Sequence, residues 1–116
     1  MNVGQQMQAL YSRFGDIDEV TIELHKELLA INIRNRAAEA TVFLQGAQLS
    51  QYQPHKEQPV IWLSPDCEYK RGLPLRGGIP ICWPWFGALD KNPESIQQQI
   101  SLNAPPAHGF VRTLEW

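Results

Sequence analysis

Apolar and polar residues alternate between Glu19 and Gln53, and this alternation restricts the fold of the 116-residue chain more than any other feature. A period of two is typical of β-strands that bury one face and expose the other to water. The alternating runs cover about residues 20–24, 29–34, 38–45 and 47–53. Short polar turns separate them, so the pattern predicts an all-β fold in which antiparallel strands form a meander within a larger β-sandwich.

A short helix is predicted before the meander. Four apolar residues have the i, i+3, i+4, i+7 spacing of an amphipathic helix: Met7, Leu10, Tyr11 and Phe14. Gly15 follows at a position where helices commonly end, so the helix is expected over about residues 4–14. It belongs to an amino-terminal lead-in, residues 1–18. Residues 19–116 are expected to form the amino-terminal portion of a β-sandwich domain, and the helix is expected to pack over one side of its sheet.

Composition and charge restrict the class of protein. A hydrophobic fraction of 43% in a chain of this length fits one domain and excludes a disordered tail. The formal net charge of −2, with both signs scattered, provides no basic surface for nucleic acid or anionic lipid. No apolar run is long enough to span a membrane, and the first residues lack the basic and apolar regions of a signal peptide, so a cytoplasmic protein is expected.

The cysteines and histidines do not have the spacing of metal ligands. Cys67 and Cys82 lack a Cys-x-x-Cys arrangement, which predicts reduced, structural thiols. His25 and His55 lie in polar turns and are expected to be solvated. No His/Asp/Glu cluster has metal-ligand spacing, and the common hydrolase and nucleotide-binding motifs are absent, so neither a metal nor a cofactor is predicted.

The stretch from Leu73 to Gly87 carries the first candidate site. Arg76 precedes the pair Gly77-Gly78, which lets the backbone pass close to another group or adopt positive φ. Three large aromatic residues follow: Trp83, Trp85 and Phe86. A fixed cation beside an aromatic wall predicts a pocket for an anionic, partly apolar ligand. The alternatives are an arginine that pairs with a loop carboxylate and aromatic residues that pack a core.

A second candidate site lies near the end of the chain. His108 stands between two small residues and can hydrogen-bond a ligand hydroxyl, although a histidine in a turn is also commonly structural. Arg112 follows four residues later. It can reach the site of Arg76 only through the fold, which local spacing does not reveal. No carboxylate has the surroundings of a buried general base.

Two short segments predict further strands. Residues 60–63 are apolar and predict a short fifth strand. Residues 113–116 are typical of the first residues of a β-strand, and no turn or polar tail follows them. The chain is therefore expected to be incomplete at its carboxyl end, with an unpaired sheet edge.

The segment 88–106 between the two candidate sites is polar and rich in Gln, Asn and Pro. Asn92 and Pro93 predict the cap and the first residue of one helical turn over residues 94–99. A loop of this length in a compact domain is usually functional or mobile.

The motif Arg76–Gly87, followed by Ala107–Arg112 and Trp116, resembles the hexose-6-phosphate mutarotases. These glucose-6-phosphate 1-epimerases are a branch of the galactose mutarotase-like (aldose 1-epimerase) superfamily. Residues 44–49 and 60–64 are also similar to the opening strands of that family. The resemblance covers roughly residues 20–116, and the Gln-rich insert 89–103 lies outside its firmest part.

The resemblance implies a large antiparallel β-supersandwich that binds a sugar in a cleft. It implies that Arg76 and Arg112 hold the 6-phosphate of a hexose 6-phosphate and that His108 contacts the sugar near its ring oxygen. The implied isomerase reaction interconverts α and β anomers by acid–base ring opening, without a metal or cofactor. In the family the general acid is a histidine and the general base a glutamate, both expected beyond residue 116, so this chain alone is expected to be inactive.

Two other hypotheses remain open at this point. The chain could be a non-catalytic carbohydrate-binding module in which Trp83 and Trp85 stack on sugars. It could also be a β-domain that pairs with a partner, such as the missing carboxyl-terminal part of the same protein, through its open edge.

Overall fold

The computed structural model describes residues 1–116 and confirms the predicted meander. Four antiparallel strands form one sheet in the order β1-β2-β3-β4. Their bounds are Val20–His25 (β1), Leu28–Arg34 (β2), Ala38–Phe43 (β3) and Gln48–Pro54 (β4). Each boundary lies within two residues of the one expected from the alternation, because that pattern responds directly to which side chains face the core.

The register of the sheet follows the apolar residues. Ile22 of β1 lies opposite Ile31 of β2, so apolar side chains of neighbouring strands share one face. The register shifts between β3 and β4, where Thr41 pairs with Gln51 and Val42 pairs with Leu49. Ser50 is therefore an additional residue in β4, and its Oγ donates a hydrogen bond to the carbonyl oxygen of Thr41 over 3.2 Å.

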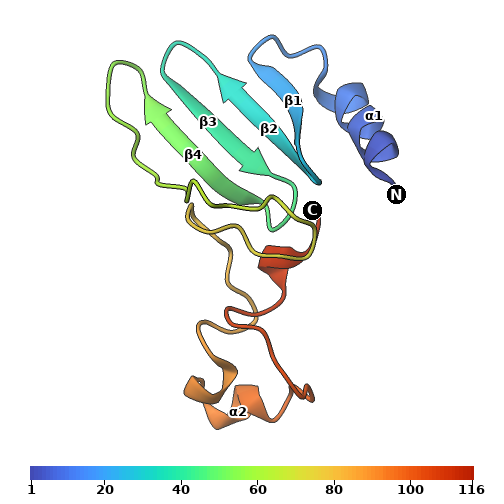
Figure 1. The fold of residues 1–116 in the computed structure, drawn as a ribbon, viewed down its shortest axis with the longest axis vertical. Coiled ribbons are helices and arrows are strands. Elements are labelled where there is room, and N and C mark those ends of the chain that lie inside the picture. The colour runs from blue at the N-terminus through green and yellow to red at the C-terminus, as the bar shows by residue number, and fades with distance from the viewer.

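The amino-terminal helix α1 spans Val3–Phe14 and lies beside β1 at one edge of the sheet (Figure 1). It begins with a capping box, because the side chains of Asn2 and Gln5 each accept a hydrogen bond from the other residue's backbone N–H. The helix ends at Gly15, as predicted. No helix of the chain is long and apolar enough to cross a membrane.

The principal core lies at one end of the sheet, beneath the loop that follows β4. Five buried side chains form it: Leu28, Ala30, Phe43, Cys67 and Leu75. Tyr69 packs against this cluster, and burial raises the pKa of its hydroxyl above the ordinary value, with a smaller contribution from the Cys67 thiol. His25 was expected to be solvated, but its ring centroid lies 5.3 Å from that of Phe43, so it belongs to this packing.

Below the sheet, residues 79–110 extend away as an arm whose tip holds α2 (Glu94–Gln97) (Figure 1). Two 3-10 helices, η1 (Leu89–Lys91) and η2 (Val111–Thr113), lie within the arm and at its return to the sheet. The predicted helical turn is present, but the prediction of Asn92 as its cap is wrong. Asn92 uses its side-chain amide to donate to the carbonyl oxygens of Phe86 and Ala88, so Pro93 occupies the N-cap position.

The predicted strand over residues 60–63 is wrong. Only Leu63 makes a β-bridge, to Gly77, while Val60 and Trp62 are largely exposed. An apolar run alone does not distinguish a buried strand from a loop that supports a surface. At the carboxyl end, the residues 113–116 make one bridge, between Glu115 and Gln45, in place of a full strand.

Buried glutamines join the sheet to the loop above it. Gln45 is 2% exposed; its Nε2 donates to the carbonyl oxygen of Leu73 and its Oε1 accepts from the backbone N–H of Gly72, both over 2.8 Å. Gln48 donates in the same way to the carbonyl oxygen of Gly77 over 2.6 Å. These bonds satisfy the polar atoms of the buried glutamine side chains and fix the loop backbone against the sheet.

Replacing Gln45 by alanine is expected to lower the free energy of unfolding by about 1–3 kcal/mol, because the buried side chain makes two hydrogen bonds to the loop backbone that are both lost. Urea unfolding measures the change. Gln51→Ala is the matched control, since Gln51 is exposed on the same sheet, and its effect is expected to stay within about 0.5 kcal/mol. Equal losses in the two variants would contradict the bridging role of Gln45.

Candidate functional site

Two motifs that are distant in the sequence form one structural unit at the base of the arm. The backbone N–H of His108 donates to the carbonyl oxygen of Gly87 over 2.8 Å, and that of Phe110 donates to the carbonyl oxygen of Trp83 over 2.9 Å. The indole Nε1 of Trp85 donates to the carbonyl oxygen of Pro106 over 3.0 Å. Residues 83–87 therefore hold residues 106–110 in place.

Gly109 is required for this close approach. Its φ is +73°, and a Cβ atom at this position would overlap the carbonyl oxygen of Trp83. Only glycine combines positive φ with contact of this kind at low cost. The glycine after His108 therefore lets the histidine segment lie directly against the aromatic segment.

The three predicted aromatic wall residues have different positions. Trp85 is 2% exposed and packs edge to face on Phe110, with ring centroids 4.9 Å apart, so it fills the interior of the arm. This burial removes Trp85 from the pocket wall and from any stacking on a carbohydrate. Trp83 and Phe86 are exposed, but neither lines the groove that contains the arginines.

His108 has one ring nitrogen fixed by the backbone. Its Nδ1 accepts a hydrogen bond from the backbone N–H of Gly87 over 2.9 Å. A neutral imidazole with an acceptor Nδ1 carries its proton on Nε2, so the remaining nitrogen is a hydrogen-bond donor. The ring of Phe86 contacts the imidazole in a T-shaped arrangement, with centroids 4.9 Å apart. His108 is thus oriented to donate from Nε2.

The backbone of Arg76 is held by pairing with residues 62–64. Its carbonyl oxygen accepts from the backbone N–H of Ser64 over 2.8 Å. The next residue, Gly77, has a φ of +109°, and a Cβ there would lie 2.5 Å from the carbonyl oxygen of Trp62. The Arg76 side chain itself is exposed and forms no ion pair, so its guanidinium is free to bind a ligand.

Arg112 lies in η2, where the chain returns to the sheet. Its backbone packs against Gly46, whose Cβ position would be 2.5 Å from the carbonyl oxygen of Arg112. The side chain is half-buried, its Nε is buried without a hydrogen-bond partner, and no carboxylate lies within ion-pairing distance. An unpaired buried donor of this kind is costly and is commonly satisfied by a ligand.

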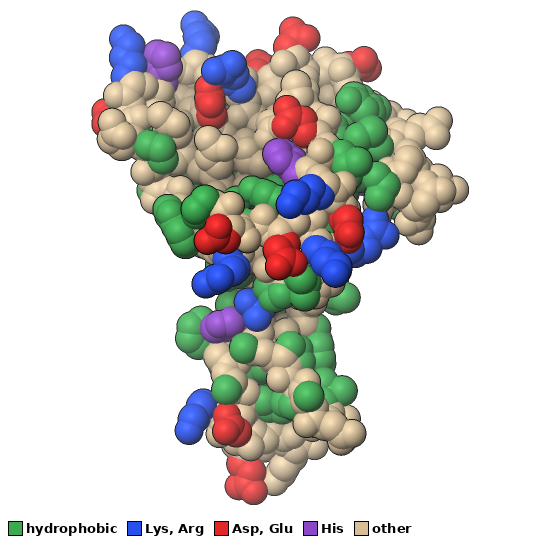
Figure 2. Space-filling model, in the orientation of Figure 1, with side chains coloured by type: hydrophobic (Ala, Val, Ile, Leu, Met, Phe, Trp, Pro, Cys, Tyr) green, Lys and Arg blue, Asp and Glu red, His purple; other side chains and the backbone are tan.

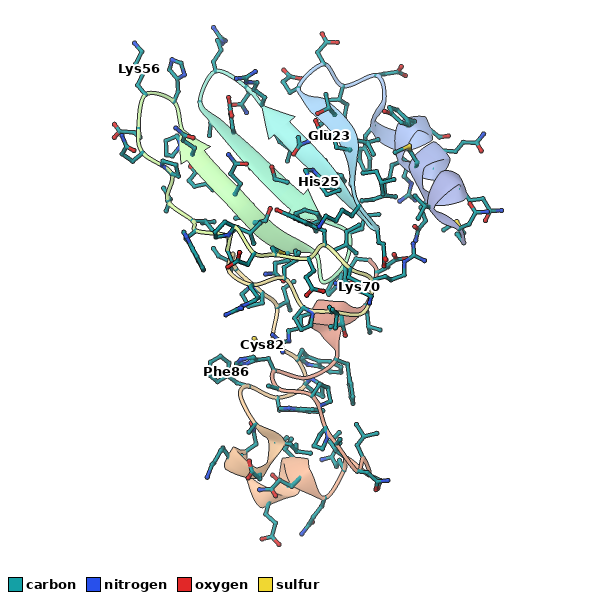
Figure 3. The ribbon with its side chains drawn as sticks, viewed as in Figure 1. Glu23, His25, Lys56, Lys70, Cys82 and Phe86 are labelled. Carbon is teal, nitrogen blue, oxygen red and sulfur yellow. The ribbon has the colours of Figure 1, made fainter.

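Arg76, His108 and Arg112 line one groove, with a volume of about 700 Å³. The fold therefore brings together the three residues that were predicted to bind substrate. Figure 2 shows mixed basic and acidic side chains over this junction of sheet and arm, and Figure 3 places Lys70 above it and Phe86 below it. Lys70 adds a third cation to the lining, against the two carboxylates of Asp66 and Glu68.

Trp62 and Lys70 are two of the groove residues that sequence reasoning missed. Trp62 is 68% exposed, and it follows the apolar pair of residues 60 and 61 that was interpreted as part of a strand. Lys70 lies in a polar loop with no local motif. The only signal available for Trp62 was a large aromatic residue in a short apolar run, which also fits a core position.

Comparisons with known proteins agree with this arrangement. The family model described as aldose 1-epimerase matches residues 30–116. The chain is similar to proteins of Escherichia coli (strain K12) and Salmonella typhimurium (strain LT2), each named "Putative glucose-6-phosphate 1-epimerase". Both are 41% identical over 90 residues, which cover 78% of this chain and 27% of the relative. The chain therefore spans about a quarter of the length of the curated relatives it matches.

Two solved structures are similar to most of the chain. One is the crystal structure of a "putative mutarotase (YeaD)" from Salmonella typhimurium, with a TM-score of 0.70 and 36% identity, covering 84% of this chain and 29% of that one. The other is the crystal structure of HI1317, with a TM-score of 0.70 and 33% identity, covering 87% of this chain and 33% of that one. This likeness confirms the predicted all-β fold class.

Proposed function

Because the chain belongs to the aldose 1-epimerase family, we propose that it forms the phosphate-binding part of an enzyme that interconverts the α and β anomers of a hexose 6-phosphate. The observation that carries this proposal is the shared groove of Arg76, His108 and Arg112. Its two guanidinium groups have no carboxylate partner within the chain. Planar guanidinium donors of this kind match the geometry of a phosphate or a carboxylate, and a hexose 6-phosphate carries the former.

In this proposal the two arginines bind the 6-phosphate and fix the position of the sugar. The Nε2–H of His108 donates to a sugar oxygen, because its Nδ1 is already occupied by the Gly87 N–H. Protonating Nδ1 would break that bond, so His108 acts as a neutral donor that orients the sugar. A neutral imidazole can polarise an oxygen in this way without transferring a proton.

The anomer exchange itself needs a base and an acid. The base removes the proton of the anomeric hydroxyl while the acid protonates the ring oxygen, the ring opens to the aldehyde, the carbonyl face rotates and the ring closes again. We propose that a glutamate and a second histidine outside residues 1–116 supply these two groups. A cytoplasmic location is part of the proposal and is supported by two free thiols, Cys67 and Cys82.

Ligand titration of the 116-residue chain tests this function. NMR titrations with glucose 6-phosphate, glucose and inorganic phosphate compare the three affinities and report which amides shift. We expect glucose 6-phosphate to bind at least tenfold more tightly than glucose and to shift the amides of residues 76–78 and 108–112. Equal affinity for glucose and its 6-phosphate would contradict the phosphate-binding role.

Polarimetry of freshly dissolved α-glucose 6-phosphate tests the placement of the acid and base. With the 116-residue chain added, the anomerisation rate is expected to equal that of buffer. An acceleration that saturates with substrate would show that the chain holds its own acid and base, and would overturn that part of the proposal.

A further inference from the structure

We propose that the indole of Trp62 is the platform on which the pyranose ring of the ligand stacks, an inference that rests on the proposed function. Two aromatic residues, Trp62 and Tyr69, line the groove together with the arginines, and Tyr69 packs against the core. Trp62 is 68% exposed, and among the exposed tryptophans of the chain, Trp62, Trp83 and Trp116, it is the one that lines this groove.

The backbone of Trp62 is fixed next to Arg76. The Trp62 carbonyl oxygen accepts from the backbone N–H of Gly78 over 2.8 Å, and the following residue, Leu63, forms a β-bridge with Gly77. The lack of a Cβ at Gly77 permits this approach, since that atom would lie 2.5 Å from the same carbonyl oxygen. The aromatic residue and the cation therefore extend from two paired backbone segments into one groove.

No other aromatic ring packs on the Trp62 indole. The aromatic contacts of the structure involve His25, Phe43, Tyr69, Trp85, Phe86, His108 and Phe110, and none involves Trp62. The Trp62 Nε1 makes no hydrogen bond either, whereas Trp85 and Trp116 each donate one. Trp62 therefore contributes a large, mostly exposed aromatic surface to the groove lining.

A sugar phosphate has the chemistry that this combination fits. The C–H face of a pyranose ring is apolar and flat enough to lie on an indole, while its phosphate and hydroxyl groups need charged and polar partners. The groove lining contains two arginines, a histidine whose Nδ1 is already bonded, and the indole of Trp62. Trp62 should therefore contribute to binding of the sugar and not to binding of phosphate alone.

The test compares Trp62→Leu with Trp83→Leu in the 116-residue chain, using calorimetric titration with glucose 6-phosphate and with inorganic phosphate. Trp83 is the matched control, because it is 63% exposed and does not line the groove. We expect Trp62→Leu to weaken glucose 6-phosphate binding about tenfold and to leave phosphate binding unchanged. Trp83→Leu should change neither affinity. Trp62→Phe should restore most of the loss, since a phenyl ring keeps a flat face.

The outcomes separate the two proposals. If Trp62→Leu binds glucose 6-phosphate like the unaltered chain while Arg76→Ala binds it weakly, the stacking role is overturned and the phosphate-binding function stands. If Trp62→Leu weakens phosphate and glucose 6-phosphate equally, the residue supports the groove and does not stack on the sugar. If the unaltered chain binds neither ligand, the proposed function itself fails.

Discussion

Replacing Gly109 by alanine is expected to detach the histidine segment from the aromatic segment, with a loss of local stability of about 3 kcal/mol. The residue has positive φ, and an added Cβ would overlap the carbonyl oxygen of Trp83. This oxygen belongs to the backbone, so it cannot move aside as the end of a flexible side chain could. Either the strain stays or residues 106–110 shift. In both cases His108 loses the position from which it lines the groove.

Hydrogen exchange of the His108 and Phe110 amides measures this loss, because both amides donate to residues 83–87. Their protection is expected to fall roughly 100-fold in Gly109→Ala. Gly87→Ala is the matched control: its φ is +66°, but no atom lies within 4 Å of the Cβ position. This control therefore introduces backbone strain alone, and the protection of the same two amides should fall about tenfold. Similar losses in both variants would show that the contact with Trp83 is unimportant.

Replacing Arg76 by alanine is expected to weaken glucose 6-phosphate binding by about 10- to 150-fold. Each hydrogen bond to a charged group contributes about 1.5–3 kcal/mol, and the Arg76 guanidinium has no other partner in the chain. Because the side chain is exposed and its backbone contacts remain, the fold should be unaffected. Calorimetric titration measures the change in affinity.

Two controls define what the Arg76 result means. Arg36→Ala removes an exposed arginine outside the groove and should not change the affinity, so a general effect of net charge would appear in both variants. Binding of unphosphorylated glucose should be nearly unchanged in Arg76→Ala. Unchanged affinity for glucose 6-phosphate in Arg76→Ala would exclude a role of Arg76 in phosphate binding.

Much of the fold was predictable because the signals for helices and strands are local. The stripe of Met7, Leu10 and Phe14 located α1, and the alternation from Glu19 onward located the four strands. Both patterns report directly which side chains face the core. The grouping of Arg76 with Arg112 needed the family resemblance, since nothing local relates residues 36 positions apart.

The errors concern residues whose surroundings come from distant parts of the chain. Trp85 and Trp62 are both flanked by apolar or aromatic residues, yet Trp85 is 2% exposed and Trp62 is 68% exposed. What buries Trp85 is Phe110, which is 25 positions away in sequence. Similarly, Asn92 is a residue type that favours the N-cap position, but its side-chain amide donates instead to two carbonyl oxygens of the preceding turn.

A crystal structure of the 116-residue chain with glucose 6-phosphate is the most direct measurement of the shared groove. We expect the phosphate oxygens within hydrogen-bonding distance, about 2.7–3.2 Å, of the guanidinium groups of both Arg76 and Arg112, with the sugar toward Nε2 of His108. A phosphate bound elsewhere, or the two guanidinium groups paired with Asp66 and Glu68 while the groove stays empty, would contradict the proposal.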